Sequence, residues 1–177
     1  MTDTEFIEAV KDSALLHGDF TLRSGRKSSY YLDKYGFVTD PAVLSELAER
    51  VAALAGDAGG YDRVAGPELG GVPIATAVGL LTGKPTVLIR NAKKDYGTAK
   101  RFEGKLEAGD RVVVTEDIAT SGGQAIEAAR LLRDECGCEV VKVVVAIDRE
   151  EGGREAVEAA GFAFAAVLTK AALGIEG

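Results

Sequence analysis

Apolar residues along this chain follow two spacings, one typical of helices and one typical of buried strands. The helical spacing predicts helices over residues 3–16, 41–58, 71–82, 122–136 and 153–161. Short apolar runs predict strands over residues 63–66, 86–90, 110–116, 140–148 and 162–169. Because these strands lack a clean polar alternation and are separated by helices, they predict a doubly wound α/β fold. Its sheet is mainly parallel and five-stranded, with helices on both faces.

The first 40 residues follow a different pattern. Residues 20–33 read as two short strands joined by a turn at Ser24-Gly25-Arg26, and Asp3 or Thr4 is the predicted cap of the first helix. With 177 residues, the chain is expected to form a single domain, with residues 1–40 as an N-terminal flap on an α/β core of residues 41–177.

Residues 91–109 are rich in Lys, Arg and Gly and lie between two core strands. A loop of this length is usually functional or disordered, and we expect a mobile loop here.

Composition excludes several classes of function. The net charge of −7 argues against a protein that grips nucleic acid over a broad surface. The apolar runs are too short to cross a membrane and the N-terminus is acidic, so a cytoplasmic location is expected. His17 is the single histidine, which disfavours a Ser-His-Asp triad or a multi-histidine zinc site. Cys136 and Cys138 have no second Cys or His pair and are interpreted as reduced thiols at a helix-to-strand turn.

The stretch VVVTEDIATSGGQ, residues 112–124, combines an acid pair with a glycine-rich turn. Glu116 and Asp117 are expected at the carboxyl end of a strand, where ligands bind in open α/β sheets. The turn from Ile118 to Gly123 precedes a helix, whose first N–H groups and dipole favour an anion such as phosphate. Carboxylates accept hydrogen bonds from vicinal hydroxyls and support Mg²⁺. A ribose 5-phosphate suits both features, since its phosphate fits the turn and its hydroxyls fit the acid pair. The alternative is an ordinary turn with two solvated acids and no ligand.

This stretch resembles the phosphoribosyl-pyrophosphate signature of the type I phosphoribosyltransferases, with Thr115 where an apolar residue is commoner. Further segments are similar in order and spacing to the orotate phosphoribosyltransferases. They are FTLRSGRKSSYYLD (20–33), GPELGGVPIA (66–75), RNAKKDYG (90–97) and AIDREEGG (146–153). The resemblance runs from about residue 5 to the C-terminus. It implies transfer of the phosphoribosyl group of 5-phospho-α-D-ribose 1-diphosphate to orotate, giving orotidine 5-phosphate and diphosphate in pyrimidine biosynthesis.

The resemblance also implies roles for individual residues. Lys94, Glu116 and Asp117 are the catalytic candidates. The candidates for binding phosphoribosyl diphosphate are Leu69, Gly70, Arg90, Lys94, Tyr96, Glu116, Asp117, Ile118, Ala119, Thr120, Ser121, Gly122, Gly123 and Gln124. The candidates for binding orotate are Arg23, Tyr31, Leu32, Thr120 and Arg149. Mg²⁺ is the implied cofactor, held mainly by the substrate, with Asp117 as the candidate protein ligand.

Some points stay open in the sequence. Many relatives have Lys at position 70, a second Lys at 91 and a His at 96, so Gly70, Asn91 and Tyr96 remove positive charge. Successive side chains of a strand point to opposite faces, so Tyr30 and Tyr31 lie on opposite sides. The sequence does not determine which of them faces a base. The resemblance implies a homodimer with shared active sites. A phosphoribosyltransferase for another base, or a non-catalytic sensor of phosphoribosyl diphosphate, remains an alternative function.

Overall fold

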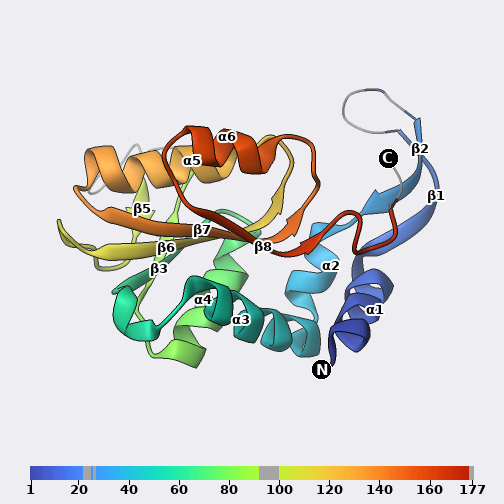
Figure 1. Cartoon of the computed structure of the whole chain (residues 1–177), viewed down its shortest axis with the longest axis horizontal. Helices are drawn as coiled ribbons and strands as arrows, with labels where there is room; N and C mark the ends of the chain where they lie inside the picture. Colours follow the sequence, from blue (N-terminus) through green and yellow to red (C-terminus); the bar gives the residue numbers. More distant parts are fainter. Residues whose placement is uncertain (22–24, 26, 92–99, 176–177) are drawn as a thin grey trace.

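The structure is a computed structural model that describes residues 1–21, 25, 27–91 and 100–175 (Figure 1). Its helices are α1 (Asp3–Ala14), α2 (Lys34–Thr39), α3 (Pro41–Ala55), α4 (Gly71–Thr82), α5 (Gly123–Arg130) and α6 (Gly153–Ala159), with a 3₁₀ turn at Ala58–Gly60 and a π-helical turn at Leu131–Glu135. Its strands are β1 (Leu15–Thr21), β2 (Lys27–Leu32), β3 (Arg63–Pro67), β4 (Thr86–Ile89), β5 (Phe102–Glu103), β6 (Arg111–Ala119), β7 (Glu139–Asp148) and β8 (Phe164–Thr169).

The central sheet has the strand order β5-β4-β3-β6-β7-β8. The five predicted strands, β3, β4, β6, β7 and β8, are all present and pair in parallel. A sixth strand, the two-residue β5, pairs antiparallel with β4 at the edge. It comes from the segment that the sequence predicted as a long loop. The α/β fold with a mainly parallel sheet is therefore confirmed.

Helices cover both faces of this sheet, as Figure 1 shows: α3 and α4 lie on one face, and α5 and α6 on the other. Each face has its own buried apolar cluster. On β6, Val113 belongs to the cluster beneath α3 and α4, whereas Val112 and Val114 belong to the cluster beneath α5. This period of two explains why the strand reads as a continuous apolar run: both of its faces are buried.

The N-terminal segment divides into a packed part and a projecting part. Phe6, Val10 and Ala14 of α1 are buried in the same cluster as α3, so α1 belongs to the core. Strands β1 and β2 form an antiparallel hairpin that extends from one end of the molecule (Figure 1). The predicted first helix ran two residues too far, because the chain turns into β1 at Leu15. The short helix α2 was not predicted.

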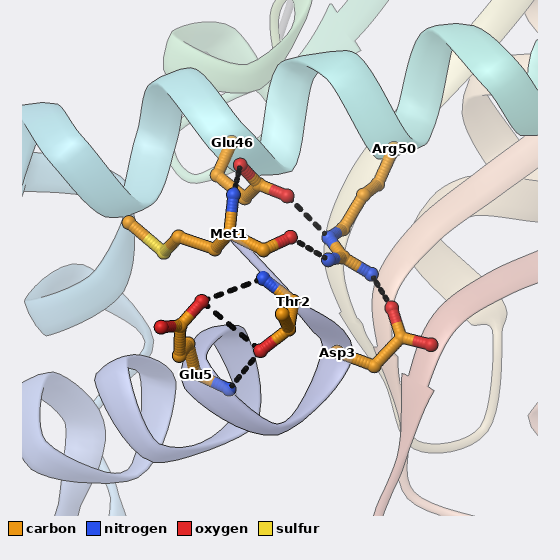
Figure 2. Close-up of polar contacts among 6 residues, drawn as sticks. All are labelled: Met1, Thr2, Asp3, Glu5, Glu46 and Arg50. Atoms are coloured by element: carbon orange, nitrogen blue, oxygen red, sulfur yellow. Dashed lines mark hydrogen bonds and ion pairs between the residues drawn. The ribbon is translucent and has the colours of Figure 1, made fainter.

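Polar contacts fasten the start of α1 to α3 (Figure 2). Arg50 of α3 lies between Asp3 and Glu46, with nitrogen-to-oxygen distances of 2.6 and 2.9 Å, and the Met1 amine contacts Glu46 at 2.9 Å. The helix cap is Thr2, which forms a capping box with Glu5, so the predicted cap at Asp3 or Thr4 was wrong by one or two residues.

Candidate active site

The site lies where the sheet changes its direction of winding. From β3 the chain passes through α4 to β4 on one side, and from β6 it passes through α5 to β7 on the other side. The loops that follow β3 and β6 therefore diverge, which leaves a crevice at the carboxyl ends of the strands. The buried hydroxyl of Thr115 donates to the carbonyls of Ala65 and Gly71, at 3.2 and 3.3 Å, and so ties β6 to β3 and to the start of α4.

Glu116 and Asp117 lie on β6 itself. The strand continues to Ala119, three residues beyond its predicted end, so Ile118 and Ala119 are strand residues and not part of the turn. Backbone pairing to β7 holds this extension, and both acidic residues are buried. Glu116 Oε1 accepts from the Asp117 N–H at 3.0 Å, and Asp117 Oδ1 accepts from the Ile118 N–H at 2.6 Å.

The outer oxygens of the two acids have different surroundings. Glu116 Oε2 is buried and has no hydrogen-bond partner among the described residues. Burial, together with the neighbouring Asp117 charge, raises the pKa of Glu116 well above its usual range. Asp117 Oδ2 lies 3.0 Å from Lys34 Nζ, an ion pair rather than a well-aligned hydrogen bond. Sequence reasoning missed Lys34, because it stands 83 positions away along the chain, on the unpredicted helix α2.

The glycine-rich turn, which the sequence predicts as a phosphate-binding turn, lies between β6 and α5. Gly122 has a φ of +74° and precedes α5, which begins at Gly123 without a side-chain cap. The first N–H groups of α5 therefore have no partner within the helix and are available to an anion. Gln124 donates from Nε2 to the carbonyl of Glu68 at 2.5 Å. This bond joins the start of α5 to the loop that follows β3.

The acid pair and the residues of the turn line one cavity of about 470 Å³. The acid pair and the turn form one part of its wall, and Tyr31, Leu32, Lys34 and Arg149 complete it. Tyr30 lies on the other side of β2, where it lines a hollow with His17 and Ile175. The alternation that the sequence left open therefore places Tyr31 in the cavity.

The loop after β3 carries Leu69 and Gly70. Leu69 is 63% exposed, whereas Gly70 is buried against the acid pair. A Cβ atom on Gly70 would overlap Asp117 Oδ2. The absence of a side chain at position 70 is therefore what allows the Asp117 carboxylate to lie against the start of α4.

Among the predicted site residues that the structure describes, Leu69, Gly70 and Arg90 do not line this cavity. Arg90 follows β4 and lies 3.9 Å from Glu103 of β5, and it is not among the described residues that line the cavity. Arg23, Lys94 and Tyr96 lie outside the described residues.

The donors present fit a magnesium ion that is shared with a substrate. Mg²⁺ takes oxygen ligands and commonly binds one or two carboxylates together with substrate phosphates. Glu116 Oε2, buried and unpaired among the described residues, and the neighbouring Asp117 supply such oxygens. In the described part of the chain no group of three or more His, Cys, Asp or Glu side chains could hold a metal by itself.

The cysteines lie away from the site. Cys136 ends the π-helical turn and Cys138 is buried just before β7, and both are free thiols, as the sequence indicated. Burial raises the pKa of the Cys138 thiol to about 11, which disfavours a reactive thiolate. Among the described helices, none is long and apolar enough to span a membrane.

Comparisons with known proteins agree on one family. Residues 38–166 match the family described as Phosphoribosyl transferase domain. The chain is 46% identical over 160 residues to an orotate phosphoribosyltransferase of Pyrococcus abyssi, covering 89% of this chain and 87% of the relative. It is 48% identical over 149 residues to that of Methanothermobacter thermautotrophicus, covering 84% and 81%.

Solved structures give the same result. The Mycobacterium tuberculosis orotate phosphoribosyltransferase in complex with 5-phospho-alpha-D-ribosyl 1-diphosphate superposes with a TM-score of 0.83 at 32% identity, covering 96% of this chain and 97% of that one.

Proposed function

Because this chain belongs to the orotate phosphoribosyltransferases within the phosphoribosyltransferase family, we propose that it transfers a phosphoribosyl group to orotate. The donor is 5-phospho-α-D-ribose 1-diphosphate, and the products are orotidine 5-phosphate and diphosphate, in the synthesis of pyrimidine nucleotides. The observation that carries the proposal is the single cavity in which the acid pair Glu116-Asp117, the glycine turn and Arg149 meet.

The donor fits the side of the cavity formed by β6 and α5. Its 5-phosphate accepts hydrogen bonds from the N–H groups at the start of α5 and from the hydroxyls of Thr120 and Ser121. The 2- and 3-hydroxyls of the ribose then donate to Glu116 and Asp117. The buried, unpaired Glu116 Oε2 supports this placement, because a hydroxyl there would supply the missing partner.

Orotate fits the side formed by β2 and the end of β7. Arg149 is 22% exposed and lines the cavity, so its guanidinium is available to the orotate carboxylate. Tyr31 and Leu32 come from the hairpin and supply apolar surface for the pyrimidine ring. Thr120 also lines the cavity and is a candidate contact to both substrates.

The chemistry requires stabilisation of charge on the departing diphosphate. As the bond from C1 to the diphosphate breaks, negative charge builds on the leaving group and positive charge on the ribose ring. Bound Mg²⁺ would supply cationic charge to the diphosphate oxygens, and Glu116 and Asp117 are the residues that would help to hold it. Lys94 is the proposed catalytic cation, with Arg90 and Tyr96 as further contacts to the donor and Arg23 as a contact to orotate.

We further propose a cytoplasmic homodimer in which Lys94 acts in the site of the partner subunit. An exposed apolar surface supports an interface between subunits: Leu80 and Leu81 at the end of α4 are 82% and 52% exposed, beside Leu44 of α3. Solvent-exposed apolar side chains that gather in a patch often mark a protein interface.

A direct assay tests the function. Protein, Mg²⁺, phosphoribosyl diphosphate and one base are mixed, and the ultraviolet absorbance of orotate is followed, with adenine, uracil and hypoxanthine in parallel reactions. We expect turnover with orotate. Turnover only with another base, or binding of phosphoribosyl diphosphate without turnover, would contradict the proposal and select one of the two alternatives.

A further inference from the structure

Lys34 is a cation inside the cavity whose role the sequence did not reveal. It is the first residue of α2, and Asp33 caps that helix by accepting from the Tyr35 N–H at 3.0 Å. The cap fixes the backbone from which the Lys34 side chain extends. Its ammonium lies 3.0 Å from Asp117 Oδ2 and 5.4 Å from the centre of the Tyr35 ring.

The charged residues of the cavity indicate a role for a cation beside the acid pair. Among the described residues that line the cavity, Lys34 and Arg149 are the cations, and Glu116 and Asp117 are the acids. Arg149 lies at the end of β7, where Glu151 contacts it at 3.3 Å. A donor that carries a diphosphate next to its ribose must place these phosphates near the acid pair. A protein cation on that side would add to the charge of a bound Mg²⁺ ion in offsetting the repulsion between the phosphates and the acids.

Gly70 determines where this cation is held. Because Gly70 has no side chain, the Asp117 carboxylate lies against the loop that follows β3, and the Lys34 ammonium meets it there. The loop contributes no cationic side chain of its own, since its residues are Glu68, Leu69 and Gly70. Lys34 therefore supplies positive charge to a loop that lacks it.

The Lys34 ammonium can leave Asp117 and pair with an anion of a ligand. The Lys34 side chain is 37% exposed and reaches Asp117 without good hydrogen-bond alignment, whereas the Asp117 side chain is only 4% exposed. A lysine has a flexible four-carbon stem and three donors that rotate freely. Lys34 can therefore turn to a second anion without any movement of β6.

We propose that Lys34 is a diphosphate-binding residue of this enzyme. Before the donor binds, Lys34 neutralises Asp117. When the ribose hydroxyls take their place at Asp117, the ammonium moves to a diphosphate oxygen. This inference rests on the proposed function, because it assigns Lys34 to the donor of that same reaction.

The first test separates the two substrates. In Lys34→Gln we expect the KM for phosphoribosyl diphosphate and the inhibition constant of inorganic diphosphate to rise about 10-fold or more, the loss typical of one charged hydrogen bond. The KM for orotate should change less than about 2-fold, well below the effect of such a bond. Lys11→Gln is the matched control, since it removes the same charge from a similarly exposed lysine of α1, which pairs with Glu8 and does not line the cavity. If Lys34→Gln behaves like Lys11→Gln, or raises both KM values equally, the assignment is wrong. Absence of turnover in the wild type would instead contradict the proposed function.

The second test distinguishes binding of diphosphate from mere neutralisation of Asp117. Binding of inorganic diphosphate with Mg²⁺ is measured by calorimetry in Asp117→Asn and in the double variant Lys34→Gln/Asp117→Asn. If Lys34 contacts the diphosphate, the double variant should bind it about 10-fold more weakly than Asp117→Asn alone. Equal affinity in the two variants would mean that Lys34 serves only as the counter-ion of Asp117, which overturns the proposal.

Discussion

At the scale of single residues, Arg149 is the candidate that distinguishes orotate from a neutral base. It lines the cavity, and its only described ion pair is with Glu151 at 3.3 Å. In Arg149→Ala, we expect the KM for orotate to rise more than that for phosphoribosyl diphosphate. Losing a charged hydrogen bond to the carboxylate should cost about 1.5–3 kcal/mol of binding free energy.

Steady-state kinetics with each substrate varied in turn checks this expectation. Arg133→Ala is a suitable control, because Arg133 pairs with its own neighbour Asp134 and does not line the cavity. A comparable rise in both KM values of Arg149→Ala would show that Arg149 does not recognise the carboxylate.

The sequence predicted the location of those candidate residues that lie near the carboxyl end of a strand. Glu116, Asp117, Thr120 and Arg149 were placed correctly at the carboxyl end of the sheet for this reason. Lys34 could not be predicted, since its meeting with Asp117 depends on how α2 packs beside β6. Local periodicity carries no information about contacts between residues so far apart along the chain.

At the scale of elements, the turn between β6 and α5 depends on Gly122. Its φ is +74°, and a Cβ atom there would lie 2.8 Å from the Gly153 carbonyl oxygen. Gly122→Ala should therefore lower the free energy of unfolding by about 1–3 kcal/mol, the usual cost of a strained backbone. Gly123→Ala is the matched control, because its φ is not positive and its Cβ would meet only Ser121 Oγ, at 3.6 Å.

Chemical denaturation of both variants provides the measurement. Gly123→Ala should be neutral or more stable by up to about 1 kcal/mol, because alanine is favoured over glycine within a helix. Equal stability of the two variants would show that the turn adjusts without strain.

Element boundaries were less predictable than the elements themselves. Helix α2 has only six residues, too few to display a helical period, and β5 has two. Strand β6 extends past the acid pair because its backbone pairs with β7 as far as Ala119 and Asp148. The prediction ended the strand at Glu116 because polar residues begin there. The observed strand ends at Ala119, where its pairing with β7 ends.

At the scale of the whole molecule, one ion pair joins the starts of β3 and β6, at the end of the sheet opposite to the candidate site. Arg111 at the start of β6 donates from Nε and Nη2 to both carboxyl oxygens of Asp62, at 3.0 and 2.9 Å, and its backbone N–H also donates to Asp62. These bonds lower the pKa of Asp62 to about 2, mainly through the Arg111 side chain.

This pKa predicts a specific loss of stability in acid. A carboxyl group whose pKa is lowered on folding stabilises the protein above its unfolded pKa, and that contribution disappears as the pH falls through the folded pKa. For Asp62 the window runs from the ordinary value of 3.8 down to about 2. Denaturation curves at several pH values should show that Asp62→Asn is less stable at neutral pH and loses less stability across this window. In Asp134→Asn the effect should be smaller, because Arg133 is adjacent in sequence and stays near Asp134 when the chain unfolds. An Asp62→Asn curve parallel to that of the wild type would contradict the assignment.

The last prediction concerns the assembly of two chains. If each site combines Asp117 of one subunit with Lys94 of the other, a hybrid of Lys94→Ala and Asp117→Asn chains has one site with both changes and one intact site. Random mixing in a two-fold dimer makes half of the dimers hybrids, so turnover should recover to roughly a quarter of the wild-type value. Mixing Lys94→Ala chains with chains that carry both substitutions is the control, since no intact site can form. Two different affinity tags allow the hybrid to be purified and its composition verified. A purified hybrid with no more activity than its parents would show that Lys94 acts in the site of its own subunit.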